Sequence, residues 1–179
     1  PPVYWANGAV APLSIDVANA PGAWPNGLKA PMLGLYLYPL GGGPDVSLTV
    51  RNLPAGRYTI LAYGHGGPPA EQNTVFELSA AGVDYGRRAT SDQPEWADAD
   101  WAEGRQYVSF TGVLVAGGEP VVIRARPGSG PLGFINGLQL RLDGDSSQVS
   151  MIPGPGIFTN AIQVRLVGGR AGDEIRYTI

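Results

Sequence analysis

The sequence has no cysteine, one histidine and one lysine among its 179 residues. Without cysteine there are no disulfides, thiolate metal sites or cysteine nucleophiles. A single histidine, His65, cannot form a zinc site, and no Gly-x-Ser-x-Gly segment is present to make it the base of a hydrolase triad. No apolar run reaches the length of a membrane-spanning helix. We therefore expect a protein that is not an enzyme and has no transmembrane segment.

Charged residues are also scarce, at 15% of the chain, and the net charge is −3. The segment 71–103 holds eight acids and two arginines, so it carries −6 and the remainder carries +3. Neither part offers the basic stripe that follows a phosphate backbone. Nucleic acid is therefore excluded as an expected partner.

The sequence does contain segments in which apolar and polar residues alternate, and 27 glycines and 17 prolines interrupt them. Val46, Leu48 and Val50 alternate with polar residues, which indicates a strand with one buried face. The next apolar segment, 58–63, carries bulk on both faces, which predicts a strand inside a sandwich rather than at its edge. The same alternation predicts strands over 33–38, 73–78, 83–85, 107–115, 120–126 and 134–142.

Two short links between these strands are predicted to close hairpins. The first is 52–56, where Pro54 restricts the backbone and Gly56 is expected to adopt a positive φ. The second is 116–119, which contains two glycines. Asn136 and Gly137 interrupt an apolar strand, which indicates a bulge or a buried polar clamp. No helical period of useful length occurs, so the fold class is all-β: an antiparallel jelly-roll β-sandwich.

Composition predicts four segments along the chain. Residues 1–32, rich in proline and glycine, form an extended N-terminal arm or an edge strand. Residues 33–142 form the sandwich, 143–147 a linker, and 148–179 a small β-appendage with strands near 161–166 and 174–179. The chain begins with Pro1 rather than methionine, which we interpret as a processed start.

Five short segments occur in a suggestive order: Leu53-Pro-Ala-Gly-Arg-Tyr58, Tyr63-Gly-His65, Asn73-Thr-Val-Phe76, Tyr107-Val-Ser-Phe110 and Ile135-Asn-Gly-Leu-Gln139. Their order and spacing resemble the galactose-binding-domain-like jelly-roll modules of large bacterial exported proteins, over about residues 30–142. The resemblance implies an extracellular or cell-surface location and glycan binding on the loops or the concave face.

The C-terminal region carries a second resemblance. Pro153-Gly-Pro-Gly-Ile-Phe158, Val164-Arg-Leu166 and Ile175-Arg-Tyr-Thr178 resemble the opening of the immunoglobulin-like domain that ends chitobiases and hexosaminidases. In that family further strands follow, whereas this sequence stops at Ile179. We expect an incomplete immunoglobulin-like appendage, which is either cut short or completed by another element.

These features favour a self-assembling structural subunit of a surface layer or filament as the leading functional hypothesis. Its partners are copies of itself, joined by strand exchange at the chain ends. The open alternative is that both ends pack on their own sandwich. The candidate assembly residues are Val3, Tyr4, Trp5, Leu13, Ile15, Ile175, Tyr177 and Ile179.

The competing hypothesis is a carbohydrate-binding module. Trp96 and Trp101 lie in an acidic loop, where indoles can stack on sugar rings or can cover the edge of the sandwich. The further candidate contacts are Tyr63, His65 and Asn73, with a hydrogen-bonded structural role favoured for His65. No cofactor is expected. Asp98 and Asp100 are weak candidates for Ca²⁺, because two acids supply too few oxygen ligands.

Overall fold

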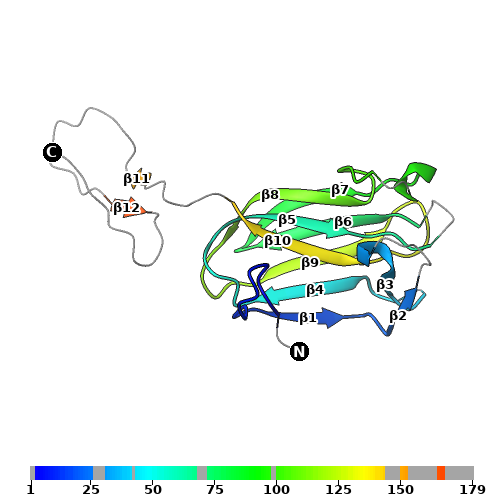
Figure 1. Ribbon diagram of the computed structural model, residues 1–179, viewed down its shortest axis with the longest axis horizontal. Coiled ribbons are helices and arrows are strands. Elements are labelled where there is room, and N and C mark those ends of the chain that lie inside the picture. The colour runs from blue at the N-terminus through cyan, green and yellow to red at the C-terminus, as the bar shows by residue number, and fades with distance from the viewer. Residues whose placement is uncertain are drawn as a thin grey trace. The chain divides into compact units, whose positions relative to one another are not determined.

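The computed structural model describes residues 3–25, 31–41, 43–67, 72–97, 100–143, 150–152 and 165–167 (Figure 1). Over these ranges the chain is strands joined by loops, with two short 3₁₀ helices. The elements are β1 (Ser14–Ala18), β2 (Gly22–Pro25), η1 (Pro31–Leu33), β3 (Leu35–Tyr38), β4 (Val46–Arg51), β5 (Gly56–Tyr63), β6 (Thr74–Ala80), β7 (Val83–Ala89), η2 (Pro94–Ala97), β8 (Tyr107–Val115), β9 (Val121–Pro127), β10 (Gly137–Leu142), β11 (Ser150–Ile152) and β12 (Arg165–Val167).

Two antiparallel sheets face each other. One has the strand order β1-β4-β9-β6-β7 and the other β10-β5-β8. The chain changes sheet on going from β4 to β5, β5 to β6, β7 to β8, β8 to β9 and β9 to β10. This confirms the predicted all-β jelly-roll β-sandwich. Contacts divide the chain into two compact units, Pro1–Leu142 and Asp143–Ile179, and the second contains the antiparallel pair β11 and β12.

The core lies between the two sheets and is built from the residues that the alternation marked as inward. Val46, Leu48 and Val50 of β4 are buried, and they face Ile60 and Phe110 of the opposite sheet. The strand β5 is the middle strand of its sheet, which confirms its expected interior place. No helix in the described part of the chain is long and apolar enough to span a membrane.

The two links predicted to be hairpins instead connect the two sheets. The strand β4 pairs with β1 and β9, while β5 pairs with β10 and β8, so the link 52–55 crosses the sandwich. The link 116–120 crosses in the same way between β8 and β9. In the first link Asn52, rather than Gly56, has the positive φ, at 58°. A Cβ on Gly56 would lie 2.7 Å from Cδ1 of Leu142, an exposed side chain that can move aside.

The N-terminal segment folds as part of the sandwich unit. The strand β1 pairs with β4 as an edge strand, and Leu13 is buried in the core. Val3 and Trp5 pack against the same core, whereas Tyr4 is exposed. These contacts correct the expectation of an arm that is free for donation, because Val3, Trp5 and Leu13 pack on the chain's own core, while Ile15 on the edge strand stays 38% exposed. The other assembly candidates, Ile175, Tyr177 and Ile179, lie outside the described residues.

Candidate functional site

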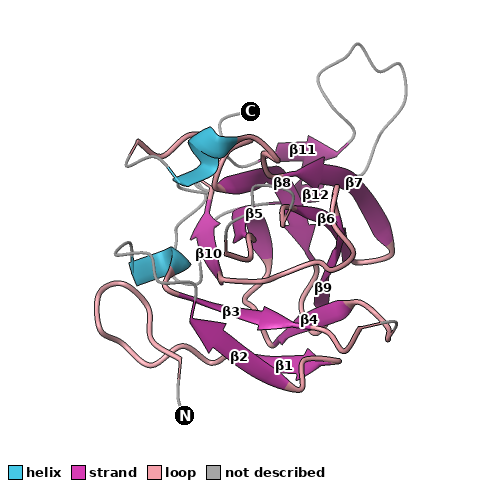
Figure 2. Cartoon of the chain, turned by 90° about the vertical axis from the view of Figure 1, so that its right-hand side faces the viewer, coloured by secondary structure: helices cyan, strands magenta, loops and turns pink. Residues whose placement is uncertain are grey.

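Long loops gather at one end of the sandwich. The links that follow β5, β7 and β9 all leave at this end, where the pair β2–β3 and both 3₁₀ helices also lie (Figure 2). The bridge between His65 and Asn73 and that between Leu37 and Ile135 tie these segments together. Two clusters of aromatic side chains lie here, each with one exposed tryptophan, and they form the candidate site.

The first cluster, which we call the platform, consists of Tyr63, Trp101, Tyr107 and Gln139. The ring of Tyr63 meets Trp101 edge to face, with centroids 5.6 Å apart, and Tyr107 at 5.4 Å. The Tyr63 hydroxyl donates to Oε1 of Gln139 at 2.9 Å. Burial, and secondarily Tyr107, raises the pKa of Tyr63. Trp101 remains 44% exposed, so its indole offers a surface to a ligand.

The backbone around Trp101 is held from below by the buried side chain of Gln106. Its Oε1 accepts from the Ala102 amide at 3.0 Å, and its Nε2 donates to the Asp100 carbonyl at 3.2 Å. Glu103 reinforces the same turn, because its Oε1 accepts from the Ser109 hydroxyl at 2.6 Å. Trp101 therefore lies on a segment that is fixed on both sides, although it belongs to a loop.

The second cluster is a groove of about 370 Å³ beside the platform. The strand register places Trp24 of β2 opposite Tyr36 of β3, and the Tyr36 ring meets Phe134 edge to face at 5.0 Å. Burial, and secondarily Tyr38, raises the pKa of Tyr36. Trp24 is 59% exposed. The residues that line the groove are Trp24, Tyr36, Tyr38, Gln72, Pro131, Leu132 and Phe134.

Two buried threonines hold the loops that carry these aromatics. The Thr74 hydroxyl donates to the Phe134 carbonyl at 3.0 Å and accepts from the Phe134 amide at 2.8 Å. The Thr90 hydroxyl donates to the Gly64 carbonyl at 2.8 Å and accepts from the Thr74 amide at 3.0 Å. Backbone amides and carbonyls that have no partner in a neighbouring strand thus form hydrogen bonds with these side chains instead.

Two asparagines complete this arrangement, which we call the polar frame: Asn73, Thr74, Thr90 and Asn136. Nδ2 of Asn73 donates to the Thr90 carbonyl, and Oδ1 accepts from the Ser129 amide, both at 2.8 Å. Oδ1 of Asn136 accepts from the His65 amide at 2.6 Å, and Nδ2 donates to the Leu35 carbonyl at 2.9 Å. The sequence-based expectation of a polar clamp at Asn136 is confirmed.

Of the predicted glycan contacts that the structure describes, Trp101 is exposed at the surface. Tyr63 lies against it but is itself only 6% exposed. His65 is 0% exposed, with Nδ1 3.0 Å from the Gly66 carbonyl, and Asn73 is buried in the polar frame. The expectation that these two contact a glycan is corrected, because their polar atoms serve the backbone of neighbouring loops.

The remaining candidates lie in the acidic loop. Trp96 belongs to η2, Asp98 lies outside the described residues, and Asp100 is exposed. Among the residues that the structure describes, no group of three or more histidine, cysteine, aspartate or glutamate side chains is placed to hold a metal ion. A Ca²⁺ site at Asp98 and Asp100 stays a prediction.

Sequence reasoning missed the groove. Trp24 falls in the segment predicted to be an extended arm or edge strand, and Tyr36 and Tyr38 fall in the predicted strand 33–38, where their alternate positions place them on the same face. The pairing of β2 with β3, which places Trp24 opposite Tyr36, has no short-range signature in the sequence.

The fold defines an antiparallel jelly-roll β-sandwich with exposed aromatic clusters at one end. No protein-family model matches the chain, and no curated protein matches it. Among solved structures, the chain is similar to one described as TmCBM61 in complex with beta-1,4-galactotriose, at 14% identity and a TM-score of 0.39. The match covers 74% of this chain and 90% of that chain.

Proposed function

We propose that the protein is a non-catalytic, extracellular carbohydrate-binding protein that holds a polysaccharide on the platform. The observation that carries this proposal is the exposed Trp101 indole, supported edge to face by Tyr63. The C–H face of a pyranose ring packs well against an aromatic surface, and its hydroxyls require polar partners at the rim. The amide of Gln139 and the hydroxyl of Tyr107 are the nearby groups of the platform that can supply them.

Rigidity of the platform supports the same function. Gln106 and Glu103 hold the loop of Trp101, and the Tyr63 hydroxyl is hydrogen-bonded to Gln139. A binding surface whose side chains are already ordered loses little conformational entropy when the ligand arrives. Trp101 is therefore suited to act as the main contact of the site.

Replacing Trp101 with alanine should weaken polysaccharide binding by about 30-fold, which corresponds to roughly 2 kcal/mol for the loss of a dominant aromatic contact. Affinity gel electrophoresis against a panel of β-glucan, galactan, xylan, mannan, polygalacturonate and alginate measures the retention. The matched control is Tyr4→Ala, which removes an exposed aromatic residue outside both clusters and should leave retention unchanged. Retention of Trp101→Ala equal to that of the unmodified protein contradicts the proposal, as does the failure of every polysaccharide to slow the unmodified protein.

We also propose self-association through β1 as a second function, because one observation favours it. Among the strands that the structure describes, this edge strand of the five-stranded sheet pairs only with β4, and Ile15 and Val17 on it are 38% and 49% exposed. An exposed apolar edge strand is a template for pairing with another sheet. The sandwich edges of two copies then join without either chain releasing a strand.

Replacing Ile15 with lysine should therefore shift the protein toward the monomer, because a charge on an edge strand opposes edge-to-edge pairing. Light scattering over a concentration series, with negative-stain microscopy of the same samples, measures the assembly state. Val83→Lys provides the control, since Val83 is exposed on β7, the opposite edge of the same sheet. A protein that is already monomeric at the highest concentration disproves this second function.

A further inference from the structure

We propose that the platform and the groove bind one carbohydrate chain together, so that the ligand is a neutral oligosaccharide of several rings running from Trp101 to Trp24. This inference rests on the proposed carbohydrate-binding function and assigns the groove to it. The groove has the composition of a sugar site: its lining residues are mostly aromatic and apolar, and their polar side-chain groups are the amide of Gln72, the hydroxyls of Tyr36 and Tyr38 and the indole N–H of Trp24.

The two clusters are joined by one short, fully paired stretch of backbone. Phe134 lines the groove, Ile135 exchanges hydrogen bonds with Leu37 at 2.8 and 3.1 Å, and Gly137 pairs with Tyr63 of the platform. Three residues of extended chain span at most about 11 Å. The backbone amide of Asn136 donates to the Tyr63 carbonyl at 2.8 Å, and the Asn136 side chain belongs to the polar frame. These bonds fix the distance between Phe134 of the groove and Gly137 beside the platform.

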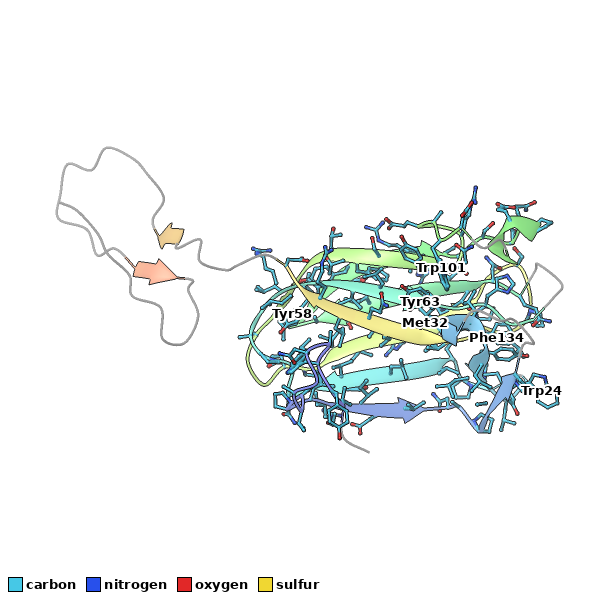
Figure 3. All side chains as sticks on the ribbon, viewed as in Figure 1. Trp24, Met32, Tyr58, Tyr63, Trp101 and Phe134 are labelled. Atoms are coloured by element: carbon cyan, nitrogen blue, oxygen red, sulfur yellow. The ribbon has the colours of Figure 1, made fainter. Side chains whose placement is uncertain are left out.

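The surface between the clusters is also apolar. Gly137 has no side chain, and a Cβ there would collide with Sδ of Met32, so Met32 covers this position. In the view of Figure 3, the labelled side chains of Trp101, Tyr63, Met32, Phe134 and Trp24 succeed one another from the platform to the groove. Methionine is flexible and adapts to irregular apolar surfaces. The strip thus has an exposed tryptophan at each end, with Met32 between them and the nearly buried rings of Tyr63 and Phe134 beneath, so a chain of sugar rings reaches both tryptophans, whereas a single ring reaches only one.

Charge indicates which class of carbohydrate fits. Among the described residues, no charged side chain lines the groove, and the platform consists of aromatic rings and one amide. The described part of the loop between β7 and β8, which lies at this end, holds four acids, Asp92, Glu95, Asp100 and Glu103, and one arginine, Arg105. An anionic polysaccharide approaching this end therefore meets repulsion with no arginine or lysine in the strip to offset it. A neutral polysaccharide meets no such cost.

The test is isothermal titration of the full chain with oligosaccharides of increasing length, from one ring to six, prepared from the polysaccharide retained most strongly in the electrophoresis panel. The affinity of the unmodified protein should rise at least tenfold with length and then level off. Trp24→Ala should abolish this rise, while Trp24→Tyr, which keeps an aromatic ring, should preserve most of it. Tyr4→Ala is again the control for loss of an exposed aromatic outside the strip.

The outcomes separate this inference from the function beneath it. Binding that is lost in Trp101→Ala but keeps its full length dependence in Trp24→Ala overturns the shared strip and leaves the platform as the site. Binding that depends on Trp24 alone also overturns the shared strip, and it contradicts the platform as well. Tighter retention by polygalacturonate or alginate than by every neutral polymer overturns the neutral class. No binding to any polysaccharide disproves the carbohydrate function itself.

Discussion

Replacing Thr74 with valine is expected to lower the free energy of unfolding by about 3 kcal/mol, although the two side chains have nearly the same shape. The Thr74 hydroxyl bonds both the carbonyl and the amide of Phe134. Both backbone groups lie in a buried region, and a methyl group in place of the hydroxyl leaves each without a partner. An unsatisfied buried polar group costs about 1–3 kcal/mol, so the two together account for the expected loss.

Urea denaturation followed by tryptophan fluorescence measures this effect. Thr49→Val is the matched control, because Thr49 lies on β4 but faces the outside of the sandwich, where valine should change stability by less than about 0.5 kcal/mol. Equal midpoints for the two variants are incompatible with the role assigned to Thr74. If Thr74→Val folds, it should also bind long oligosaccharides more weakly, because Phe134 is the groove residue whose backbone it holds.

Replacing Gly133 with alanine is expected to cost about 3 kcal/mol or more, or to prevent folding. An added Cβ would lie 2.5 Å from both the carbonyl carbon and oxygen of Arg126 and 2.6 Å from the carbonyl oxygen of Ala125. These atoms belong to β9, which is the central strand of the five-stranded sheet. Backbone paired on both sides cannot move aside, so the loop before Phe134 must shift instead.

The control for this substitution is Gly117→Ala in the link between β8 and β9. A Cβ on Gly117 meets nothing within 4 Å, and stability should stay within about 0.5 kcal/mol of the unmodified protein. Thermal unfolding by circular dichroism compares the two variants, with soluble yield as the readout if Gly133→Ala does not fold. A melting temperature for Gly133→Ala equal to that of Gly117→Ala shows that the loop accepts a side chain there.

The sequence allowed the strands and their inward faces to be predicted, because burial of one face imposes a period of two. It did not reveal which strands are neighbours. The alternation of apolar and polar residues around Val46 and Ile60 indicates that both side chains face a core. The same alternation is expected whether the two strands pair within one sheet or face each other from opposite sheets. The link that begins at Asn52 is short enough for either arrangement, so the expected hairpin was wrong while the buried residues were right.

The same limit applies to the site. Trp101 was predictable from an aromatic residue in a polar loop, and Tyr63 from its place at a strand end. Asn73 was misassigned because residue type does not reveal a partner such as Ser129, which lies far along the chain. The groove depends on β2, β3 and the loop of Phe134 meeting at one point, and each of these contacts is long-range.

The separation between the polar frame and the exposed rings has a consequence for how such a protein can diverge. Three of the four frame residues, Asn73, Thr74 and Thr90, are buried, and all four hold backbone groups of neighbouring segments. Trp24 on β2 and Trp101 in the loop before β8 are exposed and do not belong to the core. Substitution of an exposed ring therefore alters the contact surface at a small cost in folding free energy. Ligand preference can drift among descendants of this sequence while the scaffold stays under constraint, with the threonines and asparagines of the frame changing most slowly.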